Sequence, residues 1–111
     1  MKIPVFSTSI TNLEKEYVKD ALDSSWIGGS GKYLDRFESS WAEICNSKEA
    51  IAVSNGTVAI ELALMAHGIS KGDEVIVPSL TYVSTAASVK RVGATPVFVD
   101  VDNETWCIDV D

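Results

Sequence analysis

Apolar residues recur at helical spacing in two segments near the start of the chain. In the first segment Leu13 and Tyr17 share one face, and Thr11 with Glu14 forms the capping-box pattern that opens a helix. We expect this helix to end near residues 24–25.

The second predicted helix runs from about residue 33 to residue 45. Its apolar residues return every three or four positions, which is the spacing of one helix face. We expect this stripe to pack in a core rather than to bind a cofactor. The stripe consists of Leu34, Phe37, Trp41, Ile44 and Cys45.

Short apolar runs mark the second half of the chain. Residues 50–53, 74–78 and 95–101 have the length and the β-branched content of buried strands. Helical spacing fills the two intervals, up to Gly68 in the first and from about residue 83 to 91 in the second. This order predicts parallel strands joined by right-handed crossovers, with helices covering both faces of the sheet.

These patterns predict an α/β protein with a mostly parallel sheet and flanking helices. A helical segment of about residues 1–48 precedes a βαβαβ part of about residues 49–111. Three parallel strands make a thin sheet, and the chain stops soon after the third. We therefore expect the chain to be a truncated piece of a longer protein.

A polar turn, Ser54-Asn55-Gly56-Thr57, joins the first predicted strand to its helix. Backbone N–H groups at a helix start, together with the Ser54 and Thr57 hydroxyls, could bind a phosphate or a carboxylate. The alternative is an ordinary loop in which Ser or Thr only caps the helix. The turn is not a P-loop, because no Gly-Lys-Ser/Thr follows, and one glycine does not make a Rossmann fingerprint.

A glycine-rich segment, residues 26–32, separates the two N-terminal helices. Gly28, Gly29 and Gly31 exclude a regular element there. Such a loop either approaches a ligand closely or serves as a flexible connector, and the composition alone favours the connector.

Composition narrows the classes of partner. The 111 residues are 46% hydrophobic and 23% charged, as in a folded domain, and the net charge is −7 without a basic cluster. This charge argues against nucleic acid or an anionic membrane as the main partner. No signal peptide is evident, and no apolar run approaches the roughly 20 residues that span a bilayer.

Two cysteines and one histidine offer little for a metal site. Cys45 and Cys107 lie in apolar contexts and are expected to be buried thiols. His67 precedes Gly68 at a predicted helix end, where a cap or a surface position is expected. We therefore predict that the chain binds no metal.

Four ordered segments resemble a known family. Residues 53–64 are similar to the S-x-G-T-x-A-L-x-L-A-L segment of the DegT/StrS family of nucleotide-sugar aminotransferases. Residues 72–79, 81–86 and 93–102 agree with the same family in order and spacing. Within the family, residues 25–38 most resemble perosamine-synthase-like members.

The resemblance implies a fold-type I enzyme that uses pyridoxal 5'-phosphate (PLP), of which this chain is the N-terminal part of the large domain. Family members are cytoplasmic homodimers that move an amino group from glutamate to a keto group of a nucleotide-linked deoxysugar, for polysaccharides such as O-antigen. Gly56 and Thr57 would hold the cofactor phosphate, and Tyr82 would stack on the pyridine ring. The sugar nucleotide would bind near the loop residues Gly28, Gly29, Ser30 and Lys32.

The family's Schiff-base lysine would lie beyond residue 111, so the chain alone is expected to be inactive. None of its seven lysines lies in the family's lysine motif. Two alternatives stay open. One is a PLP-dependent sugar dehydratase of the same family, which lacks that lysine. The other is a non-catalytic phosphate-binding α/β domain.

Overall fold

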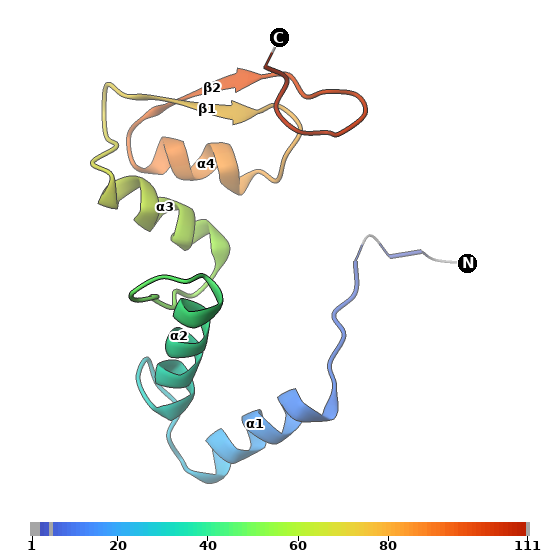
Figure 1. Cartoon of the computed structure of the whole chain (residues 1–111), viewed down its shortest axis with the longest axis vertical. Coiled ribbons are helices and arrows are strands. Elements are labelled where there is room, and N and C mark those ends of the chain that lie inside the picture. The colour runs from blue at the N-terminus through green and yellow to red at the C-terminus, as the bar shows by residue number, and fades with distance from the viewer. Residues whose placement is uncertain (1–2, 5, 111) are drawn as a thin grey trace. The chain divides into compact units, whose positions relative to one another are not determined.

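The computed structural model describes residues 3–4 and 6–110. By its internal contacts the chain divides into two compact units, Met1–Ala52 and Val53–Asp111. Figure 1 traces the elements of each unit in chain order.

The first unit contains helices α1 (Asn12–Asp23) and α2 (Lys32–Ile44). The predicted capping box at the start of α1 is confirmed, because Thr11 N donates to Glu14 Oε2 over 2.7 Å while the Thr11 hydroxyl accepts from the backbone. Ser24 caps the other end, as expected.

The apolar stripe of α2 does not form a core within the described residues. Phe37, Trp41 and Ile44 are exposed, and Leu34 is only half-buried. The prediction that the stripe packs inside is therefore wrong for this unit, because two helices offer no layer wide enough to cover it. Phe37 and Trp41 instead stack on each other, with ring centroids 5.9 Å apart.

The second unit contains α3 (Gly56–Ala66), β1 (Glu74–Pro78), α4 (Ser84–Arg91) and β2 (Thr95–Val99). The two strands pair in parallel, from Glu74 opposite Thr95 to Pro78 opposite Val99. In Figure 1, α4 lies along one face of this pair, and α3 lies beside α4.

The core of this unit lies between α4 and the strands. Val77, Val89 and Ala94 are buried there. Side chains alternate along β1, so Val77 faces inward while its neighbour Ile76 is exposed. Phe98 of β2 is exposed as well.

Two predictions about the sheet are wrong in the described chain. Residues 50–53 form no strand, because a strand needs a neighbour to pair with and the Ala52 N–H donates to Glu38 Oε1 over 2.8 Å instead. Ile51, predicted to be buried, is 74% exposed. Helices also do not cover both faces, since Ile76, on the face opposite to α4, remains open to solvent.

The last predicted strand ends two residues early, at Val99. Val101 instead forms an isolated antiparallel bridge with Ile108, which closes a C-terminal loop. Asp102 stabilises this loop by accepting from Thr105 N (2.7 Å) and from the Thr105 hydroxyl (2.8 Å). Those bonds lower the pKa of the Asp102 carboxyl.

The cysteine prediction is also wrong, because Cys45 and Cys107 are both exposed free thiols. Each lies in a short irregular segment that no other layer covers. His67 is the exposed C-cap of α3, as expected. Within residues 3–4 and 6–110, no helix is long and apolar enough to cross a membrane.

Candidate functional site

The start of α3 retains free backbone donors. Asn55 is the N-cap, and its Oδ1 accepts from Val58 N over 3.1 Å. The first N–H groups of a helix have no acceptor inside the helix. Those of Gly56 and Thr57 have none elsewhere among the described residues, so they are available to an anion.

The alternative of a Ser or Thr cap is therefore wrong at this turn. Asn55 is the cap, and the one hydrogen bond of the Ser54 hydroxyl among the described residues is accepted from the Asn55 side chain over 3.2 Å. Asn is among the strongest N-cap residues, so its place immediately before Gly56 is the sequence signal for this cap.

The Thr57 hydroxyl contacts the neighbouring helix. Its Oγ1 lies 2.7 Å from Ser84 Oγ, at the first position of α4. The Ser88 hydroxyl, one turn further along α4, donates to the Thr57 carbonyl over 3.2 Å. The starts of α3 and α4 are thus joined by side-chain hydroxyls. The i, i+4 spacing of these two small polar residues places them on one face of α4, but it does not indicate that this face meets Thr57.

Tyr82 lies in the loop between β1 and α4, two residues before Ser84. It is 77% exposed, so its ring does not pack under the following helix. Because Ser84 contacts Thr57, the loop that carries Tyr82 lies at the same end of the second unit as the start of α3. This is the carboxyl end of β1, where ligands of open α/β sheets bind.

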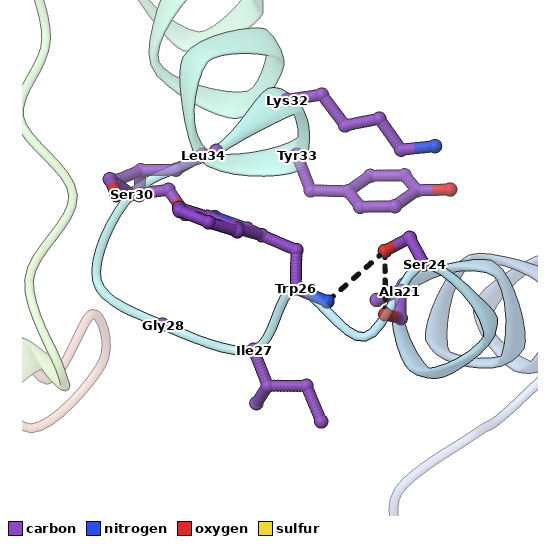
Figure 2. Close-up of a pocket in the computed structure, with 10 residues that line it drawn as sticks. Ala21, Ser24, Trp26, Ile27, Gly28, Ser30, Lys32, Tyr33 and Leu34 are labelled. Atoms are coloured by element: carbon purple, nitrogen blue, oxygen red, sulfur yellow. Dashed lines mark hydrogen bonds between the residues drawn. The ribbon is translucent and has the colours of Figure 1, made fainter.

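The glycine-rich loop of the first unit folds around the Trp26 side chain (Figure 2). Trp26 Nε1 donates to the Ser30 carbonyl over 2.5 Å. A Cβ on Gly31 would lie 2.6 Å from the indole ring, whereas Gly28 and Gly29 have no neighbouring atom within 4 Å of that position. The loop is therefore tightly packed at its end near α2, whereas its middle is open.

A largely apolar cavity of about 520 Å³ adjoins this loop. Figure 2 shows the Trp26 ring inside the loop and the Ile27 side chain pointing away from it. The predicted substrate residues Gly28, Ser30 and Lys32 line the cavity.

Lys32 forms an ion pair with Asp20, whose Oδ2 also accepts from the Tyr33 hydroxyl over 2.7 Å. The hydrogen bond with Asp20 raises the pKa of the Lys32 amine, and the bonds from Lys32 and Tyr33 lower the pKa of the Asp20 carboxyl. Both groups are fully charged at neutral pH.

The predicted site residues fall into two groups. Gly56, Thr57 and Tyr82 belong to the second unit, and Gly28 to Lys32 belong to the first. Two N–H donors at a helix start, with a hydroxyl beside them, suit a phosphate ester in charge and shape. The donor set of the second unit thus fits the phosphate of PLP.

Comparison with known proteins identifies the family to which this chain is similar. Residues 8–111 match the model of the DegT/DnrJ/EryC1/StrS aminotransferase family. GDP-perosamine synthase from Escherichia coli O157:H7 is 56% identical over 108 residues, which are 97% of this chain and 30% of that relative. The chain therefore spans about a third of the length of the curated relatives it matches.

Solved structures agree with the α/β prediction. The PLP form of Spr1654 from Streptococcus pneumoniae, described as a sugar aminotransferase, matches 98% of this chain and 28% of its own, with 34% identity and a TM-score of 0.87. A GDP-4-keto-6-deoxy-D-mannose-3-dehydratase from E. coli, with bound hydrated PLP, matches 97% of this chain and 29% of its own, with 32% identity and a TM-score of 0.84. The predicted fold class is confirmed by these similarities.

Proposed function

Because the chain belongs to the DegT/DnrJ/EryC1/StrS aminotransferase family, we propose that it is the N-terminal part of a PLP-dependent sugar aminotransferase. The enzyme moves an amino group from glutamate to a keto group of a nucleotide-linked deoxysugar. The observation that carries this proposal is the 56% identity to a GDP-perosamine synthase across nearly the whole chain. The same identity favours a GDP-linked sugar as the substrate.

The proposal includes the setting of the enzyme. It acts in the cytoplasm as a homodimer and supplies an amino sugar for a polysaccharide such as O-antigen. Residues 1–48 form its N-terminal helical segment, and residues 49–111 belong to its large domain. The 111-residue chain alone is inactive, because the Schiff-base lysine lies outside it.

In the proposed enzyme Gly56 and Thr57 hold the cofactor phosphate. Their backbone N–H groups lie at the positive end of α3, and a dianion there satisfies donors that have no other partner among the described residues. The Thr57 hydroxyl adds a charge-assisted hydrogen bond. When bound, PLP supplies an electron sink for the amino transfer.

Tyr82 covers one face of the pyridine ring in the proposed site. A stacked aromatic side chain limits the tilt of the ring and excludes water from that face. The exposure of Tyr82 supports this role, because the side chain is free to contact a ligand.

The glycine-rich loop of the first unit meets the sugar nucleotide. At Gly28 and Gly29 the open backbone allows a ligand to approach closely, and Ser30 offers a hydroxyl. Lys32 exchanges its exposed partner Asp20 for a phosphate of the nucleotide, because an exposed ion pair is weak and easily replaced.

The dehydratase is the second candidate, favoured by the match to the E. coli GDP-4-keto-6-deoxy-D-mannose-3-dehydratase. Its 32% identity is well below the 56% of the synthase. The two activities share this part of the fold and differ at the lysine, which lies elsewhere in the sequence.

One experiment separates the candidates. The full-length protein is incubated with PLP, glutamate and GDP-4-keto-6-deoxymannose, and the products are identified by mass spectrometry. The proposal predicts 2-oxoglutarate together with an aminated GDP-sugar. A deoxygenated keto-sugar would instead identify a dehydratase, and the absence of PLP binding would favour a non-catalytic domain.

A further inference from the structure

The contact between Thr57 and Ser84 pairs two hydroxyls across two helices. Their oxygens lie 2.7 Å apart, and Ser84 is 9% exposed. Neither hydroxyl has another hydrogen-bond partner among the residues that the structure describes. Ser84 therefore occupies one side of the Thr57 hydroxyl. The other side can form a hydrogen bond with a ligand at the start of α3.

A hydroxyl donates one hydrogen bond and accepts up to two. If Thr57 donates to Ser84, the Thr57 hydroxyl has no proton left for a ligand. The lone pairs of its oxygen then face the ligand and repel an anion. If Ser84 donates to Thr57, the Thr57 proton is free to donate outward. An anion at the start of α3 selects the second arrangement, and donation from Ser84 also polarises the Thr57 hydroxyl.

We propose that Ser84 is a positioning residue for the cofactor phosphate, which it serves by donating to Thr57 Oγ1 and turning the Thr57 proton toward the phosphate. This inference rests on the proposed function and deepens it. Ser84 itself does not touch the phosphate. It fixes the rotamer of Thr57, whose β-branched side chain has few alternatives.

Ser88 provides a matched control on the same helix. It is fully buried at 0% exposure and also contacts Thr57, but it donates to the backbone carbonyl over 3.2 Å. Removing the Ser88 hydroxyl perturbs the packing between α3 and α4 without touching the Thr57 side chain. An effect specific to Ser84 is thereby separated from a general loss of packing.

The test measures PLP binding to the full-length protein by absorbance titration. We expect Ser84→Ala to raise the dissociation constant about 2- to 13-fold, the range for the loss of one hydrogen bond. Ser88→Ala should change it less than about twofold. In a Thr57→Ala background, Ser84→Ala should have no further effect, because the residue through which Ser84 acts is gone.

A phosphorus NMR spectrum of bound PLP supplies the second readout. Ser84→Ala should shift the phosphate resonance, whereas Ser88→Ala should leave it in place. An unchanged resonance and dissociation constant in Ser84→Ala would overturn the inference, as would an equal loss in the Thr57→Ala background. If the unsubstituted protein binds no PLP, the proposed function itself fails, so the two failures are distinguishable.

Discussion

Thr57 is the residue on which the proposed cofactor site depends most directly. We predict that Thr57→Ala weakens PLP binding in the full-length protein by about 1.5–3 kcal/mol, the range for a hydrogen bond to a charged group. Absorbance titration measures the affinity, and the melting temperature of the protein without PLP reports the fold. Thr57→Ser keeps the hydroxyl and should bind nearly as well. Equal affinities for Thr57→Ala and the unsubstituted protein would reduce Thr57 to a structural residue.

Tyr82 allows a test of stacking apart from its hydroxyl. Tyr82→Phe should keep the ring and most of the turnover, whereas Tyr82→Ala should lower turnover and alter the absorption band of bound PLP. A stacked aromatic pair contributes about 0.5–1.5 kcal/mol beyond the area that it buries. Tyr82 would lose its assignment if both the spectrum and the rate of Tyr82→Ala matched those of the unsubstituted protein.

Sequence patterns identified the position of Thr57 but not its partner. The turn from Ser54 to Thr57 is a local signal, because four adjacent residues carry both the helix start and the donors. Ser84 lies 27 residues further along the chain, and its contact depends on how α3 and α4 pack. Packing of that kind is set by tertiary contacts, which a single sequence does not display.

At the scale of elements, Gly31 controls how α2 begins. Its φ of 130° and ψ of 175° belong to a region almost exclusive to glycine, and a Cβ there would meet the Trp26 ring. We predict that Gly31→Ala lowers the free energy of unfolding of the full-length protein by about 1–3 kcal/mol. It should also change the fluorescence of Trp26, measured in a background in which every other tryptophan is replaced by Phe.

Gly28→Ala is the control for that substitution. Nothing lies within 4 Å of the added Cβ, so the fluorescence and the unfolding midpoint should change little. Equal behaviour of the two variants would mean that the Trp26 ring does not rest against Gly31 in solution.

The capping box of α1 predicts a pH dependence. The hydrogen bonds from Thr11 lower the pKa of the Glu14 carboxyl, so Glu14 stabilises the folded helix above its unfolded pKa of about 4.3. That stabilisation is lost as the pH falls from about 4.3 through the lowered value. We predict that helical circular dichroism declines over this window.

Glu14→Gln isolates the contribution of this one carboxyl. Glutamine also completes a capping box but does not titrate. Any advantage of Glu14 over Gln in helical circular dichroism should therefore shrink as the pH falls below about 4.3, because both side chains are then neutral. A constant difference across the acid range would exclude a titrating Glu14 as its source.

Helices were predicted closely because their limits are encoded locally. The bounds of α1 follow from Thr11 and Ser24, and α2 begins one residue before the expected position. The strand expected at residues 50–53 did not form, since its stability depends on a neighbour elsewhere in the chain. The register of β1 against β2 is likewise non-local, although their order in the sequence predicted parallel pairing.

At the scale of the whole molecule, the two-stranded sheet leaves an apolar face open. Ile76 is exposed on it, because its side chain alternates with that of the inward-facing Val77 and so points away from α4. We predict that the 111-residue chain by itself is poorly folded or self-associates, because apolar faces and unpaired strand edges pair readily with other copies. Light scattering after size-exclusion chromatography measures the mass of the particle.

A charge on the open face should reduce this association. Ile76→Lys adds one positive charge there, and Glu104→Gln adds the same net charge in the C-terminal loop as a control. Only Ile76→Lys should lower the average mass. A monomeric chain with one sharp, cooperative thermal transition would contradict the prediction and would favour a small independent domain.

The two exposed thiols are natural labelling positions for measuring a distance within the chain. Cys45 belongs to the first unit and Cys107 to the second, and both are free and reachable by reagents. A donor and an acceptor dye can therefore be attached to the natural sequence without adding or removing a cysteine. Energy transfer between the dyes would report the distribution of distances between the two units, and adding PLP or a GDP-sugar would show whether either ligand narrows it.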